Sequence, residues 1–148
     1  MFAEGLAPEI LTVDNHVDGP YLYLKMKKEN PARAKEVLEL LEMNEGNSTG
    51  HGIGCVSWDG EVYPDQFWRN QPQGNVLQKP FSKIWTDEKN EFLMKLKDKK
   101  KHLRGRCATC VWLNVCGGNF RARAEAAGDI WGDDPACYLT DEEIAKKE

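Results

Sequence analysis

The fold of this chain is decided by one stretch, Cys107-Ala-Thr-Cys110-Val-Trp-Leu-Asn-Val-Cys116, which continues into Gly117-Gly118 and is completed by Cys137. The spacing is C-x2-C-x5-C-x20-C, and four thiolates complete either a [4Fe-4S] cluster or a tetrahedral zinc site. Two residues between the first two cysteines let one tight turn aim both sulfurs at one centre. The two glycines let the backbone approach a bulky ligand. We therefore predict that all four cysteines are metal ligands.

Two other interpretations of these cysteines are open at this point. They could be buried thiols that happen to cluster, or parts of a disulfide framework. Residues 1–8 lack the charged start and apolar centre of a signal peptide, so we expect a reducing, cytoplasmic environment.

Length and composition limit the possible functions. The chain has 148 residues, which is enough for one domain, or for a small domain and a fragment of another. The formal charge of −4 argues against general nucleic-acid binding. No apolar run approaches the roughly 20 residues that span a membrane, so no membrane partner is expected.

The first part of the chain, residues 1–45, reads as a strand and two helices. Residues 10–13 are typical of a short strand, and Asp18 before Gly-Pro is expected to cap a helix over 21–28. The Asn30-Pro31 step begins a second helix, which Gly46 ends. One strand and two helices cannot form a domain, so this segment is interpreted as the end of a larger α/β unit.

Residues 46–148 are predicted to form a second, α+β unit. Asp59-Gly60 lies between two β-prone runs and predicts a hairpin that pairs residues 53–58 with 61–64, followed by a turn-rich stretch at 71–74. Helical segments are expected at 80–85, after a cap at Asp87, at 120–127, and after the capping box that starts at Thr140.

The helix after Asp87 has a strongly basic outer side. Its cations are Lys95, Lys97, Lys99, Lys100, Lys101 and Arg104. Such a run is usually a solvated face. The alternative is that positive charge lies near the metal site, where it would favour the reduced form of an anionic cluster.

Several motifs resemble one family. The hairpin Trp58-Asp-Gly-Glu-Val-Tyr-Pro64, the segment Gly74-Asn-Val-Leu77 leading to Ile84-Trp85, and the cysteine spacing are similar to a SPASM domain. SPASM domains are C-terminal extensions of radical-SAM enzymes that hold one or two auxiliary iron–sulfur clusters. The resemblance covers about residues 50 to 140. It implies a SPASM-like α+β fold, with a short hairpin and helices around a four-cysteine cluster, preceded by the last elements of a partial (β/α) barrel.

The chain departs from the family pattern at two positions. Asp65 and Phe120 stand where the family usually has cysteines, and both losses fall on the same auxiliary cluster. The resemblance therefore implies a single auxiliary [4Fe-4S] cluster on the remaining four cysteines. Cys55 lies outside the pattern and is interpreted as a small buried residue, with a labile cluster position as the alternative.

Further motifs resemble one branch of this family. Thr12-Val-Asp-Asn-His-Val-Asp-Gly19, Gly52-Ile-Gly-Cys-Val56 and Tyr63-Pro-Asp-Gln-Phe-Trp68 are similar to radical-SAM proteins of d1-type haem and sirohaem-dependent haem synthesis. This implies an iron-tetrapyrrole substrate with carboxylate arms. The candidate substrate-binding residues are His16, Asp18, Asp65 and Arg69, because Arg holds carboxylates through paired hydrogen bonds and His ligates iron or transfers protons.

The C-x3-C-x2-C motif that radical-SAM enzymes use for S-adenosylmethionine is missing from the sequence. We therefore expect that this chain alone does not start the radical reaction. S-adenosylmethionine and a second [4Fe-4S] cluster would belong to an N-terminal part, and electrons would come from an external donor. The alternative functions are the SPASM domain of a peptide-modifying enzyme and a small four-cysteine zinc-binding interaction module.

Overall fold

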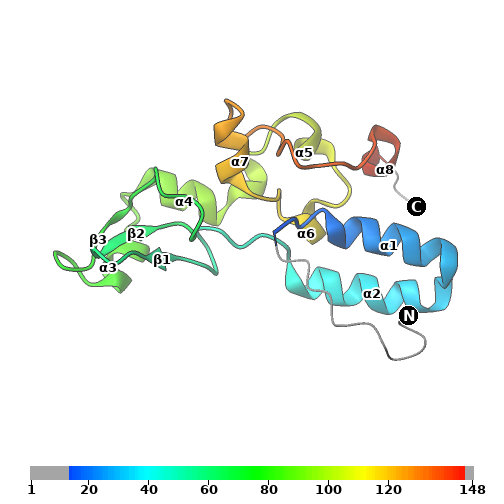
Figure 1. Ribbon diagram of the computed structural model, residues 1–148, viewed down its shortest axis with the longest axis horizontal. Helices are drawn as coiled ribbons and strands as arrows, with labels where there is room; N and C mark the ends of the chain where they lie inside the picture. The colour runs from blue at the N-terminus through cyan, green and yellow to red at the C-terminus, as the bar shows by residue number, and fades with distance from the viewer. Residues whose placement is uncertain (1–13, 146–148) are drawn as a thin grey trace.

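The computed structural model describes residues 14–145 and is elongated (Figure 1). A hairpin of two long helices, α1 (Asp18–Glu29) and α2 (Pro31–Asn44), forms one end. A small sheet with two helices forms the other end. The segment that carries the four cysteines lies between them, on one side of the helical hairpin.

Local capping explains the helical hairpin. The Asn30 side chain accepts a hydrogen bond from the backbone N–H of Arg33 at 3.2 Å, and Pro31 occupies the first position of α2. The helix ends where Glu45 and Gly46 turn left-handed, with φ of 59° and 69°. Both helices were predicted. The predicted role of Asp18 was wrong, because Val17 is the N-cap of α1 and Asp18 lies in its first turn.

The sheet has three antiparallel strands in the order β1-β2-β3: β1 (Cys55–Val56), β2 (Glu61–Tyr63) and β3 (Gly74–Asn75). In the register of the central strand β2, Tyr63 pairs with Cys55 of β1, and Val62 pairs with Gly74 of β3. The hairpin around Asp59-Gly60 was predicted, although its strands are shorter than expected. Strand β3 was not predicted, since its residues follow a stretch that reads as turn. The strand expected at 10–13 lies outside the described residues.

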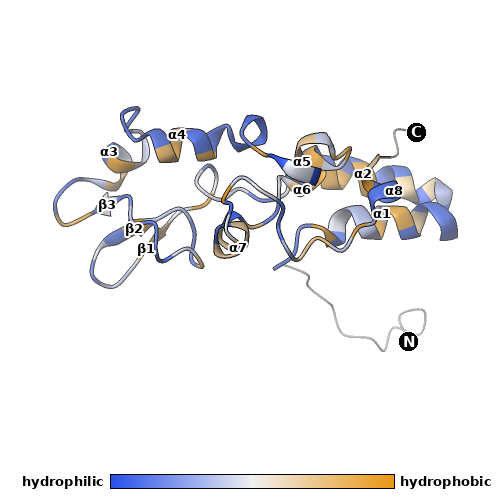
Figure 2. Cartoon of the chain, turned by 90° about the horizontal axis from the view of Figure 1, so that it is seen from above, coloured by the Kyte–Doolittle hydropathy of each residue, from blue (hydrophilic) through white to orange (hydrophobic). Residues whose placement is uncertain are grey.

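Helices α3 (Phe81–Trp85) and α4 (Glu91–Lys97) cover the sheet, and the 3-10 helix η2 (Lys99–Lys101) follows α4. The N-cap of α4 is Asn90, which accepts a hydrogen bond from Leu93, so the expected cap at Asp87 was wrong. Figure 2 shows the hydrophilic outer side of α4 in blue. The core of this end consists of side chains that are at most 3% exposed: Val62, Trp68, Ile84, Leu93 and Leu96.

The remaining helices are short: α5 (Gly105–Thr109), α6 (Leu113–Cys116), α7 (Arg121–Ala126) and α8 (Asp141–Ala145). Helix α6 packs against both α1 and α2, and α5 packs against α8. The predicted capping box at α8 is confirmed, because Thr140 and Glu143 exchange side chain-to-backbone hydrogen bonds of 2.8 and 3.3 Å. Helices and a small antiparallel sheet confirm the predicted α+β class. None of the helices within residues 14–145 could cross a membrane.

Candidate metal centre

Four cysteines from separate parts of the C-terminal half line one pocket. Cys107 lies in α5, Cys110 caps its C-terminal end, Cys116 ends α6, and Cys137 lies in the loop before α8. All four are half-buried and free of disulfides, which removes the disulfide interpretation for this structure. The rest of the wall is largely apolar: Val17, Trp112, Leu113, Gly118, Asn119, Asp134 and Leu139. Cys55 is not part of this wall and pairs with Tyr63 in the sheet.

The protonation of these thiols follows from their burial and from one another. Burial, together with negative charge on Cys107, Cys137 and Cys110, raises the pKa of Cys116 to about 12. Burial likewise raises the pKa of Cys107 and of Cys110. Thiolates are therefore unfavourable in this pocket unless a metal replaces their protons.

The four thiols surround a space and do not converge on one point. Within residues 14–145, no three His, Cys, Asp or Glu side chains form a group that would hold a metal ion. The pocket instead takes its thiols from three places: α5 and its C-cap, the end of α6, and the loop before α8. A cluster of several atoms suits this donor set, because each cysteine would bind a different iron.

A left-handed turn after Cys116 brings the cysteine segment onto the linker that follows α2. Gly117, Gly118 and Asn119 have φ of 67°, 78° and 54°. A Cβ atom on Gly117 would lie 2.7 Å from the backbone nitrogen of Asn47, so only glycine fits there. The Asn47 N–H donates to the Cys116 carbonyl at 3.1 Å. The linker thus fixes the position of Cys116.

Two buried cations lie near the thiols. Arg121, in α7, is fully buried and donates to the carbonyls of Gly118, Ile130 and Gly132. Lys99 is 6% exposed and donates to Asn47. Negative charge on Cys116 raises the pKa of both Lys99 and Arg121, and the charge of Arg121 lowers that of Lys99, which places all three groups in one electrostatic neighbourhood.

The sequence did not reveal these two buried cations. Lys99 stood in a basic run whose members Lys95, Lys100, Lys101 and Arg104 are indeed exposed, so the solvated interpretation holds for most of the run. Arg121 carried no sequence signal. Helix α4 ends at Lys97, so its helical periodicity does not extend to Lys99. Lys99 lies in η2, where its side chain is buried.

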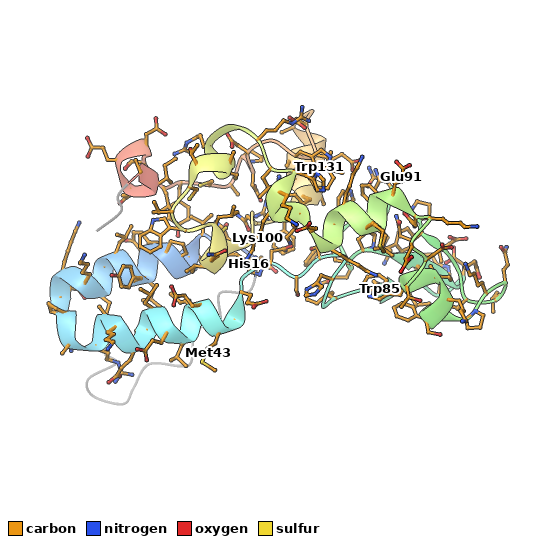
Figure 3. The ribbon with its side chains drawn as sticks, turned by 180° about the vertical axis from the view of Figure 1, so that it is seen from behind. His16, Met43, Trp85, Glu91, Lys100 and Trp131 are labelled. Carbon is orange, nitrogen blue, oxygen red and sulfur yellow. The ribbon has the colours of Figure 1, made fainter. Side chains whose placement is uncertain are left out.

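Of the four candidate substrate residues, two lie near the start of α1. His16 is half-buried, and its ring lies 5.3 Å from that of Phe120. Burial lowers the pKa of His16, and the cations Lys99 and Arg123 lower it further. Asp18 accepts a hydrogen bond of 2.6 Å from the Tyr138 hydroxyl. In Figure 3, His16 lies in the middle of the molecule, between the helical hairpin and the sheet.

The other two candidates lie after β2. Asp65 is 2% exposed and accepts hydrogen bonds from the Thr49 hydroxyl at 2.6 Å and the Phe67 N–H at 2.8 Å. Arg69 is exposed, and its guanidinium lies 5.2 Å from the ring centroid of Trp58 and 5.9 Å from that of Tyr63. Within residues 14–145, no hydrogen bond or ion pair joins any two of the four candidates.

Comparison with protein families identifies the class of the cysteine-bearing half. Residues 50–111 match the SPASM model, described as an iron–sulfur cluster-binding domain. This match includes the sheet, Cys107 and Cys110, and ends before Cys116 and Cys137. Residues 50–111 are therefore similar to a SPASM domain, as the motifs predicted.

Three curated relatives of this chain are named for haem or porphyrin synthesis. The chain is 62% identical over 145 residues to the Fe-coproporphyrin III synthase of Methanosarcina barkeri, an alignment that covers 95% of this chain and 36% of the relative. It is 40% identical over 135 residues to the pre-heme d1 synthase of Dinoroseobacter shibae, covering 89% of this chain and 33% of the relative. The AdoMet-dependent heme synthase of Nitratidesulfovibrio vulgaris is 33% identical over 96 residues, or 64% of this chain and 25% of the relative.

These matches confirm the predicted resemblance to the SPASM domain of radical-SAM enzymes of haem and d1-type haem biosynthesis. The chain spans about a third of the length of the first two relatives. No solved structure matches the chain significantly.

Proposed function

We propose that this chain is the auxiliary-cluster part of a radical-SAM enzyme of haem or d1-type haem biosynthesis. Residues 46–148 form the cluster domain, and residues 1–45 are the last elements of the radical-SAM barrel. Cys107, Cys110, Cys116 and Cys137 hold one auxiliary [4Fe-4S] cluster. The enzyme acts in the cytoplasm.

One observation carries this proposal: four free thiols from α5, α6 and the loop before α8 line a single pocket in a domain of iron–sulfur cluster-binding type. The protein's part is to supply four ligands from fixed backbone positions and to exclude water with Val17, Trp112 and Leu139. The bound cluster would supply one-electron transfer.

The substrate would be an iron tetrapyrrole with carboxylate arms, as the names of two relatives suggest for those proteins. Arg69 is suited to hold one arm, because it is exposed, its guanidinium lies close to the rings of Trp58 and Tyr63, and arginine binds carboxylates through paired hydrogen bonds. His16 and Asp18 complete the proposed substrate-binding set, and the buried Asp65 belongs to it as a positioning residue through its hydrogen bonds with Thr49 and Phe67. S-adenosylmethionine, a second [4Fe-4S] cluster and contact with an external electron donor belong to the rest of the enzyme.

Two other functions would use the same pocket. A peptide-modifying SPASM enzyme is less favoured because the relatives found are named for haem and porphyrin synthesis. A zinc module is less favoured because the matching domain is described as iron–sulfur cluster-binding.

Anaerobic reconstitution tests the proposal. The full chain is purified without oxygen and supplied with iron, sulfide and thiol, and in a parallel sample with zinc. We expect brown protein with absorbance near ~400 nm, acid-labile sulfide and about four iron atoms per chain. Colourless protein with stoichiometric zinc, and no iron retained, would contradict it.

The ligand set is tested by substitution. Cys137→Ala should lose most of the iron, because metal binding and local folding are coupled. Cys55→Ala is the matched control: it removes a thiol from the sheet, outside the pocket, and should keep wild-type iron content. Equal iron loss in both variants would show that the ligand set is wrong.

A further inference from the structure

Lys99 is a buried cation that forms no ion pair or hydrogen bond with a carboxylate of residues 14–145. It is 6% exposed, and its ammonium donates to the backbone carbonyl of Asn47 and, at 2.6 Å, to the Asn47 side-chain oxygen. Both acceptors are neutral. The ion pairs found within residues 14–145 do not include Lys99. A buried charge without an opposite charge is costly, so this lysine requires an explanation.

Asn47 joins Lys99 to the four-cysteine pocket, which is negative when it holds a cluster. The Asn47 N–H donates to the carbonyl of Cys116 at 3.1 Å, so one residue joins the ammonium to the cysteine segment. Burial is the main reason that the pKa of Lys99 is lowered to about 7; negative charge on Cys116 is the largest contribution that raises this pKa, and Asp65 contributes less. Arg121 and Lys100 act in the opposite direction. The ammonium is therefore compensated when the Cys116 side of the pocket is negative.

We propose that Lys99 is a positioning residue that sets the reduction potential of the cluster in the four-cysteine pocket. The inference rests on the function proposed above. Reduction adds an electron to an already anionic centre, and a buried ammonium beside one ligand stabilises that added charge. Loss of the ammonium makes the cluster harder to reduce.

The other cations of the region cannot replace Lys99 in this role. Lys100 is exposed and donates to Asn114, so water and salt screen its charge. Arg121 is buried, but three backbone carbonyls depend on it, so its removal would disturb the loop itself. Lys99, by contrast, is buried and donates hydrogen bonds to Asn47 only, so its charge can be removed without disturbing the cysteine segment directly.

A redox titration of the reconstituted full chain, followed by EPR, tests this role. Lys99→Met removes the charge and keeps the length of the side chain. Lys99→Arg keeps the charge, and Lys100→Met is the matched control for loss of an adjacent, exposed charge. At a fixed ambient potential, Lys99→Met should lower the ratio of reduced to oxidised cluster at least tenfold, which is about 59 mV for one electron. Lys99→Arg and Lys100→Met should stay within twofold of wild type.

A second variant keeps the test decisive if Lys99→Met does not fold. Asn47→Asp preserves the acceptor that Lys99 and the Thr49 N–H use, and it places a carboxylate directly against the ammonium. It should lower the reduced fraction in the same direction.

Iron and sulfide content are measured first for each variant. If Lys99→Met holds a full cluster and has the wild-type reduction potential, the role of Lys99 is overturned while the proposed function stands. Where Lys99→Met does not fold, the same result for Asn47→Asp overturns it. Absence of iron from the wild-type chain would instead overturn the proposed function, and the role of Lys99 with it.

Discussion

Gly46 lies 61 residues before Cys107 in the sequence, yet its replacement should disrupt the metal centre. It has a φ of 69°, and a Cβ atom built on it would overlap the backbone of Val115 and Cys116. The linker after α2 therefore touches the end of α6 with no space for a methyl group. Gly46→Ala must either separate these two segments or distort the backbone that carries Cys116.

The size of the effect follows from three contributions. A left-handed conformation costs alanine roughly 1–2 kcal/mol relative to glycine. Separating the segments breaks the hydrogen bond from Asn47 to Cys116, worth about 1 kcal/mol. Overpacking against a rigid backbone adds roughly 1–3 kcal/mol. We therefore expect Gly46→Ala to lower the free energy of unfolding by about 3–6 kcal/mol.

The assay is urea unfolding of the anaerobically reconstituted chain, followed by circular dichroism and by cluster absorbance. Gly128→Ala is the matched control, because Gly128 also has a positive φ, of 106°, but a Cβ atom there would meet nothing within 4 Å. The control should show the cost of backbone strain alone and retain its iron. Equal destabilisation by the two substitutions, with iron content unchanged in both, would refute the close approach of residue 46 to Cys116.

Two further predictions concern the proposed substrate residues. Burial and neighbouring cations lower the pKa of His16, so the unfolded chain binds a proton at higher pH than the folded chain does. The folded state should therefore lose stability as the pH falls below about 6.5, the ordinary pKa of histidine. His16→Gln should reduce the difference between the urea midpoints at pH 7.5 and 5.5, and an unchanged difference would show that His16 is not its source. In the complete enzyme, Arg69→Ala should weaken binding of the proposed iron-tetrapyrrole substrate by roughly 1.5–3 kcal/mol, or about 10- to 150-fold, because a charged hydrogen bond is lost. Anaerobic titration measures this, with Lys83→Ala as a control for an exposed cation near the sheet. Equal affinities with intact clusters would leave Arg69 a structural role.

Local signals in the sequence predicted much of this structure. The C-x2-C pair, the Asp59-Gly60 turn and the capping box before α8 each depend on residues a few positions apart, so they can be recognised from the sequence alone. The pocket is lined by cysteines that are up to 30 positions apart in the sequence, from Cys107 to Cys137. Their common spacing pattern identified them before any contact was known.

The features that were not predicted depend on contacts between distant residues. Strand β3 exists because Gly74 pairs with Val62, although its own residues read as turn. Glu125 is another example: its carboxylate accepts hydrogen bonds from Trp68, Asn70 and Gln71, which joins α7 to the sheet end. Lys99 and Glu125 look like ordinary surface charges in the sequence, because nothing adjacent to them shows what lies opposite.

The two positions that depart from the family pattern lie in one region of the structure, and this supports a single auxiliary cluster. The Asp65 carboxylate already accepts hydrogen bonds from Thr49 and Phe67, so both of its oxygens are in use. The ring of Phe67 lies edge-on to that of Phe120, with centroids 5.3 Å apart. Phe120 is 7% exposed and fills the space with apolar surface. A hydrogen-bonded carboxylate and an aromatic pair stabilise this region by packing, and they offer iron no thiolate. The domain would thus keep one centre for electron transfer and use the position of the other for structure.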